Sequence, residues 1–437
     1  MDIYSYQNIM NKQPVVIVAT IGSVSNGKST IIEDISGTKT QKYAEEKKKG
    51  CSIKNGYANA KIYKCSSCNE PECFQSTSSE IMEYNCKLCN TKCELQTHIS
   101  FIDNPGHHEF IKTMMNGSSS IDYAMLIESA ANYMASDTNI SDFFPAKQTK
   151  EHVNIITKNK VPIRIVCINK FDLVDKKSTG EKIIKELETY VKKETKKKKT
   201  IIAVSATLKI NIDYICKELC NLPIPERNIE DSFRMIINRS FNINKQNINI
   251  IDIKGGVIGG IITRGIIKIG DKIKIYPGYY TNDGYMPINA TAVSINSSTV
   301  PLDVAIPGGL IGIQLDIDPA LTSDDNLVGH VVEIQGNHSK SKVCKKIKIY
   351  KFNYENISEQ LNINDKVSLN INSNNIFATV IDISNIDNDI NINFDLEIPV
   401  CIEHKDLVIV SLNKNNKYDG IIGSGKILNG IEFDLLN

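Results

Sequence analysis

Long hydrophobic runs are missing from this sequence. No stretch of about 18 consecutive apolar residues occurs, so no segment is suited to crossing a bilayer as a helix. The first residues, Met1 to Asn11, are polar and lack the apolar core of a signal peptide. These two absences predict a cytoplasmic protein without a membrane partner. In that compartment we expect the twelve cysteines to be reduced rather than paired in disulfides.

An excess of one charge is also missing. Lys and Arg number 51 and Asp and Glu number 50, which gives a formal net charge of +1. A protein that binds nucleic acid by charge alone is more basic than this. If the chain binds RNA, it must therefore use a local patch or a shaped pocket. Its 437 residues, 41% of them hydrophobic, suffice for several domains with separate cores.

The pattern of hydrophobic residues changes near Pro223 to Arg227. Before this point, short β-branched runs alternate with helical stretches, which predicts an α/β domain with a mostly parallel sheet at residues 1–227. After it, period-two strands separated by glycines predict two β-barrels, at residues 228–340 and 341–437. The expected fold is one α/β domain followed by two β-barrel domains.

A phosphate-binding loop follows the first expected strand. Gly22 to Ser29 fits the pattern G-x-x-x-x-G-K-S, directly after the apolar run Val15 to Ile21 and before a helical stretch. In that context backbone N–H groups and the helix N-terminus attract phosphates. We expect Lys28 to reach the β- and γ-phosphates and the Ser29 hydroxyl to bind Mg²⁺. The residues expected to line the phosphates are Gly22, Val24, Ser25, Asn26, Gly27, Lys28, Ser29 and Thr30.

A second motif selects the base. Asn169, Lys170 and Asp172 form an N-K-x-D sequence after the apolar run Ile163 to Ile168, at the sheet edge where nucleotides bind. The Asp172 carboxylate can accept hydrogen bonds from N1 and N2 of guanine, a donor pair that adenine lacks. Ser205 and Ala206, after the next strand, are expected to close the base pocket with backbone contacts. The first domain is therefore expected to be a P-loop GTPase domain.

A third motif serves the γ-phosphate. Asp103 ends a strand and begins the sequence D-x-x-G-H, which places its carboxylate on the Mg²⁺ side. The Gly106 N–H can then sense the γ-phosphate. His107 is expected to orient the attacking water, with Lys28 and Gly106 as the other catalytic groups. The alternative for His107 is a loop histidine that contacts a partner.

Two C-x-x-C pairs, Cys65/Cys68 and Cys86/Cys89, are separated by 17 residues. This spacing is typical of a zinc ribbon, in which each pair gives two thiolates to one tetrahedral ion. We expect a structural Zn²⁺ held by these four thiols in a knuckle at residues 65–93. Cys73 and Cys93 are alternative ligands, and a knuckle without metal also remains open.

These motifs, in this order and followed by two barrels, resemble the elongation factor Tu class of translational GTPases. The stretch Gly256 to Asp271 is similar to the first barrel of that class. Further segments resemble in particular the gamma subunits of eukaryotic and archaeal translation initiation factor two. These segments are Gly56 to Tyr63 before the cysteines, Lys254 to Gly256, Pro307 to Gly312, Gln148 with Thr149, and Glu151 with His152.

The resemblance implies a fold, ligands and partners. The first domain would switch between GTP and GDP, and initiator methionyl-tRNA would dock between its switch regions and the first barrel. Alpha and beta subunits would complete a heterotrimer that works on the small ribosomal subunit, where a GTPase-activating factor stimulates hydrolysis. Ser52 stands where the family has a Mg²⁺-binding threonine. Tyr57 lies in the family's tRNA-facing segment and is a candidate tRNA contact, or else an aromatic side chain packed at a strand end.

The chain also departs from the family pattern. Ser23 and Asn26 replace histidines of the phosphate loop, and Ser52 lacks the methyl group that stiffens threonine. An alternative function is therefore a GTP-bound scaffold or competitor that occupies the same partners without hydrolysis. An elongation-type carrier of all aminoacyl-tRNAs is a third possibility, against which the cysteine knuckle argues.

Overall fold

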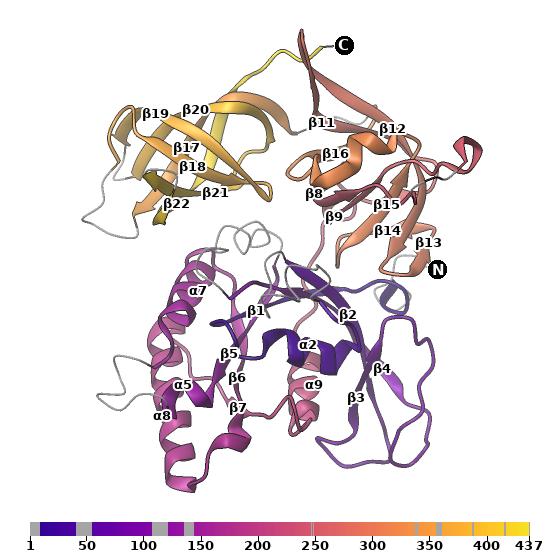
Figure 1. Ribbon diagram of the computed structural model, residues 1–437, viewed down its shortest axis with the longest axis vertical. Coiled ribbons are helices and arrows are strands. Elements are labelled where there is room, and N and C mark those ends of the chain that lie inside the picture. The colour runs from indigo at the N-terminus through magenta and orange to yellow at the C-terminus, as the bar shows by residue number, and fades with distance from the viewer. Residues whose placement is uncertain are drawn as a thin grey trace. The chain divides into compact units, whose positions relative to one another are not determined.

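The computed structural model describes residues 9–40, 55–106, 121–134, 144–245, 247, 249–336, 340–354, 361–386, 389–414 and 417–436. The chain divides into two compact units, one up to Glu226 with the short segments Ser297–Val300 and Gly308–Leu310, and one made of the remainder. Figure 1 shows the elements of both units.

The first unit is built on a seven-stranded sheet in the order β3-β2-β4-β1-β5-β6-β7. The five strands from β4 to β7 in this order run parallel, whereas β2 pairs antiparallel with β4 and β3. The strands are β1 (Val16–Ile21), β2 (Gly56–Lys64), β3 (Phe74–Ser78), β4 (Glu94–Asp103), β5 (Tyr123–Ser129), β6 (Ile163–Asn169) and β7 (Ile201–Ala203). Every residue of β1 and β5 is buried, because parallel strands are covered on both faces.

Helices pack on this sheet. Helix α2 contacts β2, β3 and β4 and packs with α9, whereas α7 contacts β1 and β5 and packs with α8. The helices are α2 (Lys28–Ser36), α5 (Ala130–Met134), α7 (Lys147–Lys158), α8 (Lys177–Thr195) and α9 (Ile212–Cys220), with the short 3-10 helix η2 (Phe171–Leu173). Among the described residues, no helix is long and apolar enough to cross a membrane.

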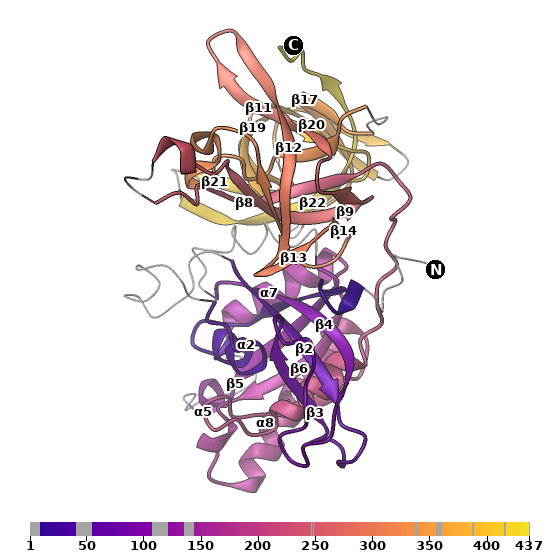
Figure 2. The same cartoon turned by 90° about the vertical axis from the view of Figure 1, so that its right-hand side faces the viewer.

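The second unit contains two antiparallel barrels. In the first barrel the strand order is β11-β16-β8-β9-β15-β12, and pairing between β11 and β12 closes the ring. Its strands are β8 (Arg234–Phe241), β9 (Val257–Arg264), β11 (Lys272–Thr281), β12 (Gly284–Ser297), β15 (Ile311–Leu315) and β16 (Val331–Ile334). The small pieces beside it are β10 (Ile267–Lys268), β13 (Val300–Leu302), β14 (Val304–Ala305), η3 (Ile250–Asp252) and η4 (Pro319–Asp325). Strands β11 and β12 extend as a long hairpin (Figure 2).

The second barrel is closed in the order β17-β20-β19-β18-β21-β22. Its strands are β17 (Lys342–Tyr354), β18 (Lys366–Ile371), β19 (Asn374–Ile386), β20 (Asp389–Ile402), β21 (Leu407–Lys414) and β22 (Lys417–Glu432). Alternate side chains point inward, as in β15 of the first barrel, where Ile311, Ile313 and Leu315 are buried between half-exposed neighbours. The predicted fold class, an α/β GTPase domain followed by two β-barrels, is confirmed.

Candidate functional site

The phosphate loop connects β1 to α2. Ser25 and Gly27 have positive φ angles of 61° and 86°, so the backbone turns sharply before the helix. A Cβ atom at Gly27 would lie 2.1 Å from the Asn169 amide nitrogen, so only glycine fits there. The predicted phosphate-binding residues, Gly22 and Val24 to Thr30, lie along this loop and the first turn of α2. The positive end of the helix dipole therefore adds to the backbone N–H groups.

Side chains of α7 hold the beginning of the loop. The Gly22 N–H donates to His152 Nδ1 at 3.2 Å, and the Ser23 N–H donates to Thr149 Oγ1 at 3.0 Å. The Ser23 hydroxyl donates to Gln148 Oε1 at 2.6 Å. In the sequence, Gln148, Thr149 and His152 indicate only a family resemblance. In the structure they satisfy buried groups of the phosphate loop.

Lys28 and Asp103 lie beside the phosphate loop and interact electrostatically. The Lys28 ammonium donates to the carbonyl oxygens of Gly22 at 3.0 Å and Ser23 at 2.9 Å. Burial lowers the pKa of Lys28 to about 8, although the negative charges of Asp103 and Glu128 oppose this shift. A group with this pKa keeps its positive charge at neutral pH, and it can therefore neutralise a phosphate.

Asp103 is fully buried at the end of β4. Burial raises the pKa of this carboxyl group, while hydrogen bonds from Ser29, Thr40 and Thr20 and the charge of Lys28 act in the opposite direction. The Thr40 hydroxyl donates to Asp103 Oδ2 at 2.5 Å, and the Thr20 hydroxyl lies 3.2 Å from Oδ1. The structure thus brings Ser29 and Asp103, two of the predicted Mg²⁺ ligands, together. The contribution of Thr40 had no sequence signal.

Gly106 lies directly against the phosphate loop. A Cβ atom at this position would lie 2.5 Å from Lys28 Nζ and 2.6 Å from the Val24 nitrogen. Only a glycine therefore allows this approach, which is what a sensor of the γ-phosphate requires. The predicted water-orienting residue His107 and the predicted Mg²⁺ ligand Ser52 lie outside the described residues.

The base-reading residues follow β6 and β7. The Asn169 side chain donates to the Asn26 carbonyl at 2.9 Å and accepts the Ala206 N–H at 3.0 Å, so it joins the phosphate loop to the predicted base pocket. Asp172 is exposed in η2. Ser205 is buried beside Ala206, and Lys170 has a left-handed backbone. All five predicted guanine-binding residues therefore lie at the carboxyl ends of two adjacent parallel strands.

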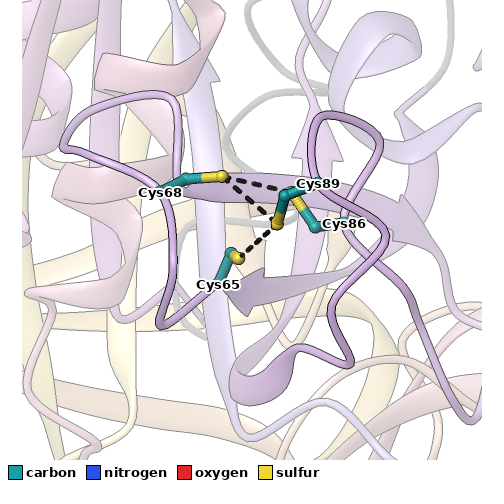
Figure 3. Close-up of side chains that lie close together, drawn as sticks. All are labelled: Cys65, Cys68, Cys86 and Cys89. Carbon is teal, nitrogen blue, oxygen red and sulfur yellow. Dashed lines mark hydrogen bonds between the residues drawn. The ribbon is translucent and has the colours of Figure 1, made fainter.

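The four predicted zinc ligands converge from two loops (Figure 3). The sulfur atoms of Cys65, Cys68, Cys86 and Cys89 all lie within 4.8 Å of one another. Three of the pairs are 3.4 to 3.6 Å apart. Zinc–sulfur bonds of about 2.3 Å place tetrahedral thiolates about 3.8 Å apart, so this donor set fits a zinc ion.

The other predicted residues of this region are arranged differently. Cys73 and Cys93 are buried in the hydrophobic core beside the knuckle and are not members of the four-thiol cluster. Burial raises the pKa of both thiols. Tyr57, the candidate tRNA contact, is half-buried in β2, where it pairs with Ile102.

Comparisons with known proteins identify the family of this chain. Residues 13–226 match the family described as the elongation factor Tu GTP binding domain. The chain is 33% identical to the translation initiation factor 2 subunit gamma of Methanococcus vannielii, across 96% of this chain and 100% of that protein. It is 36% identical to the eukaryotic translation initiation factor 2 subunit gamma of Schizosaccharomyces pombe, across 75% of this chain and 73% of that protein.

A solved structure supports the fold. The translation elongation factor SelB from Methanococcus maripaludis, in complex with the GTP analogue GppNHp, matches with a TM-score of 0.68 and 20% identity, across 96% of this chain and 80% of that one. Fold, site and matches define a translational GTPase, an enzyme that binds and hydrolyses GTP. Within that class, the chain belongs to the family of translation initiation factor 2 gamma subunits.

Proposed function

We propose that this protein binds GTP with Mg²⁺, carries initiator methionyl-tRNA to the small ribosomal subunit, and hydrolyses GTP to GDP when the start site is selected. The observation that carries this proposal is the joined nucleotide site. Asn169 links the phosphate loop to Ala206, one of the residues proposed to bind guanine, in a chain whose relatives are named gamma subunits of an initiation factor. The relatives' names also support alpha and beta partner subunits, and a GTPase-activating factor completes the proposed set of partners.

Each site residue has a proposed role. Ser29, Ser52 and Asp103 would hold Mg²⁺, which supplies charge neutralisation between the phosphates. Lys28 would bind the phosphates, and the Gly106 N–H and His107 would serve hydrolysis. Asn169, Lys170, Asp172, Ser205 and Ala206 would bind guanine. The thiols of Cys65, Cys68, Cys86 and Cys89 would hold one structural Zn²⁺.

We propose different roles for the two barrels. The first barrel, residues 228–340, would face the tRNA together with Tyr57, and residues 341–437 would form the second barrel domain. Because the net charge is only +1, tRNA binding would depend on a shaped surface rather than on a general basic field.

The test is filter binding of purified protein to charged initiator and elongator methionyl-tRNAs, each with GTP·Mg²⁺ and with GDP. We expect tight binding of the initiator form only, and only with GTP. Equal binding in both nucleotide states, or none in either, would contradict the carrier function.

A single-turnover hydrolysis assay with the small ribosomal subunit and the activating factor then distinguishes the GTP-hydrolysing carrier from the non-hydrolysing scaffold. Tight binding without stimulated hydrolysis would favour the scaffold.

A further inference from the structure

Glu128 is a buried carboxylate that none of the roles above uses. It lies next to the end of β5 in the run YAMLIES, and its side chain is fully buried. A buried carboxylate is costly unless several donors satisfy it. Three donors meet on Glu128 Oε1: the Ser129 N–H at 3.1 Å, the Asn132 amide at 2.5 Å and the Asn26 amide at 3.3 Å.

One of these donors belongs to the phosphate loop itself. The Asn26 side chain is fully buried, and its amide nitrogen also donates to the Ile127 carbonyl at 2.9 Å. Its oxygen accepts the Asn132 amide at 3.0 Å. Asn26, Glu128 and Asn132 therefore form a closed ring of hydrogen bonds, and the Asn26 peptide oxygen continues to Asn169. The ring fixes the orientation of the loop at residue 26.

Thr149 on α7 holds the other end of the loop. It accepts the Ser23 N–H at 3.0 Å. Burial raises the pKa of Glu128, and the nearby Thr149 side chain acts in the opposite direction. Glu128 is thus bonded directly to residue 26, and Thr149 beside it holds residue 23. These two residues flank the turn at Ser25, where the backbone adopts a positive φ.

We propose that Glu128 is a positioning residue of the nucleotide site, which acts through Asn26 to hold the phosphate loop in the shape that binds GDP and GTP. Phosphates bind to backbone N–H groups whose directions are set before the ligand binds. Greater conformational freedom of the loop therefore lowers the affinity for the nucleotide. The inference rests on nucleotide binding by this GTPase and not on the delivery of tRNA.

The test uses release of the fluorescent nucleotide mant-GDP from the full-length protein with Mg²⁺, followed by stopped flow. Glu128→Ala removes the acceptor, and we expect release about tenfold faster than from the unmodified protein, as for the loss of buried hydrogen bonds. Glu128→Gln keeps an oxygen for the three donors. We therefore expect release within about threefold of the unmodified rate. Glu181→Gln, at an exposed glutamate of α8, is the matched control and should leave the rate unchanged.

Two results would overturn the inference. One is a folded Glu128→Ala protein with the unmodified release rate. The other is a Glu128→Gln protein that releases mant-GDP as fast as Glu128→Ala. The rate of release would then depend on the charge of residue 128 and not on the position of its acceptor oxygen.

If Glu128→Ala does not fold, Asn132→Ala replaces it, because Asn132 is only half-buried. Its release should be about threefold faster, and an unchanged rate contradicts the inference. Failure of the unmodified protein to bind mant-GDP would instead count against the nucleotide site itself.

Discussion

His98 in β4 is a fully buried histidine whose tautomer follows from its two partners. Its Nδ1 lies 2.9 Å from the Met10 carbonyl oxygen, and its Nε2 lies 2.8 Å from the Ser79 hydroxyl. A carbonyl oxygen can only accept, so Nδ1 carries the proton and Nε2 accepts from Ser79. Burial lowers the pKa of His98 to about 3, and the nearby positive charge of Lys61 acts in the same direction.

This depressed pKa predicts loss of stability in acid. Below the unfolded pKa of about 6.5, the unfolded chain binds a proton that the folded chain does not, so stability falls as the pH drops from about 6.5 towards 3. One proton corresponds to about 1.4 kcal/mol of unfolding free energy per pH unit. His98→Asn, which keeps an amide donor for Met10, should flatten the slope by about that amount in urea titrations at pH 6 to 4. The exposed His404→Asn is the control, and equal slopes for the His98→Asn and unmodified proteins would contradict the prediction.

The knuckle makes a prediction at the scale of elements. Its two loops connect β2 to β3 and β3 to β4, and the four thiols are their meeting point. The four sulfur atoms lie within 4.8 Å of one another, close enough to bind one tetrahedral ion. We therefore expect about one zinc per chain after gel filtration with EDTA, measured by atomic emission.

Removing one ligand should remove the metal. Cys89→Ser alters the exposed member of the cluster, so zinc should fall to background while the core of the first unit stays folded. Cys220→Ser, at a half-buried cysteine outside the cluster, should keep its zinc. Full zinc content in Cys89→Ser would show that a different set of four residues holds the ion.

Elements also differ in how far the sequence predicts them. The phosphate loop, the N-K-x-D segment and the C-x-x-C pairs each place their chemistry within a few adjacent residues, so a pattern could identify them. Thr40 contacts Asp103 across 63 residues, and Ser23 contacts Thr149 across 126. No local pattern records such a contact. Glu128 did leave a signal, a carboxylate at the end of an apolar strand, but its partners could be known only from the fold.

The whole-molecule arrangement was predictable in kind and not in detail. Period-two strands predict barrels, because alternate side chains must point into a core. The structure contains both predicted barrels, each a closed ring of strands. The strand order did not follow from the pattern, since β11 closes its barrel by pairing with both β16 and β12. The polar contacts between the barrels could not be predicted from the sequence either. Asn238, for example, donates to Ser373 of the second barrel at 3.1 Å, although both are short polar side chains of ordinary appearance.

Two arginines join the barrels of the second unit. Arg234 in β8 donates to Asp406 at 2.7 Å, and Arg264 in β9 donates to Glu403 at 2.6 Å. The Arg234 side chain is only 4% exposed and the Glu403 side chain 19%, so water screens these charges weakly. Both acceptors precede β21 of the second barrel. The network is therefore a joint between the two barrels as well as a source of stability.

Replacing Glu403 by Ala should loosen both barrels at once. The change removes the carboxylate that lies 2.6 Å from Arg264 and leaves Asp231 at 3.9 Å. This largely buried charge loses its hydrogen-bonded partner, which costs about 2 kcal/mol of unfolding free energy after allowance for partial exposure. Hydrogen-exchange mass spectrometry should then report faster exchange in β8 and β9 as well as in β21, with GTP binding unchanged. The control is Glu432→Ala, whose partner Lys342 is 62% exposed, and which should cost less than about 1 kcal/mol. Faster exchange confined to the second barrel would mean that the ion pairs stabilise only that barrel and do not couple the two.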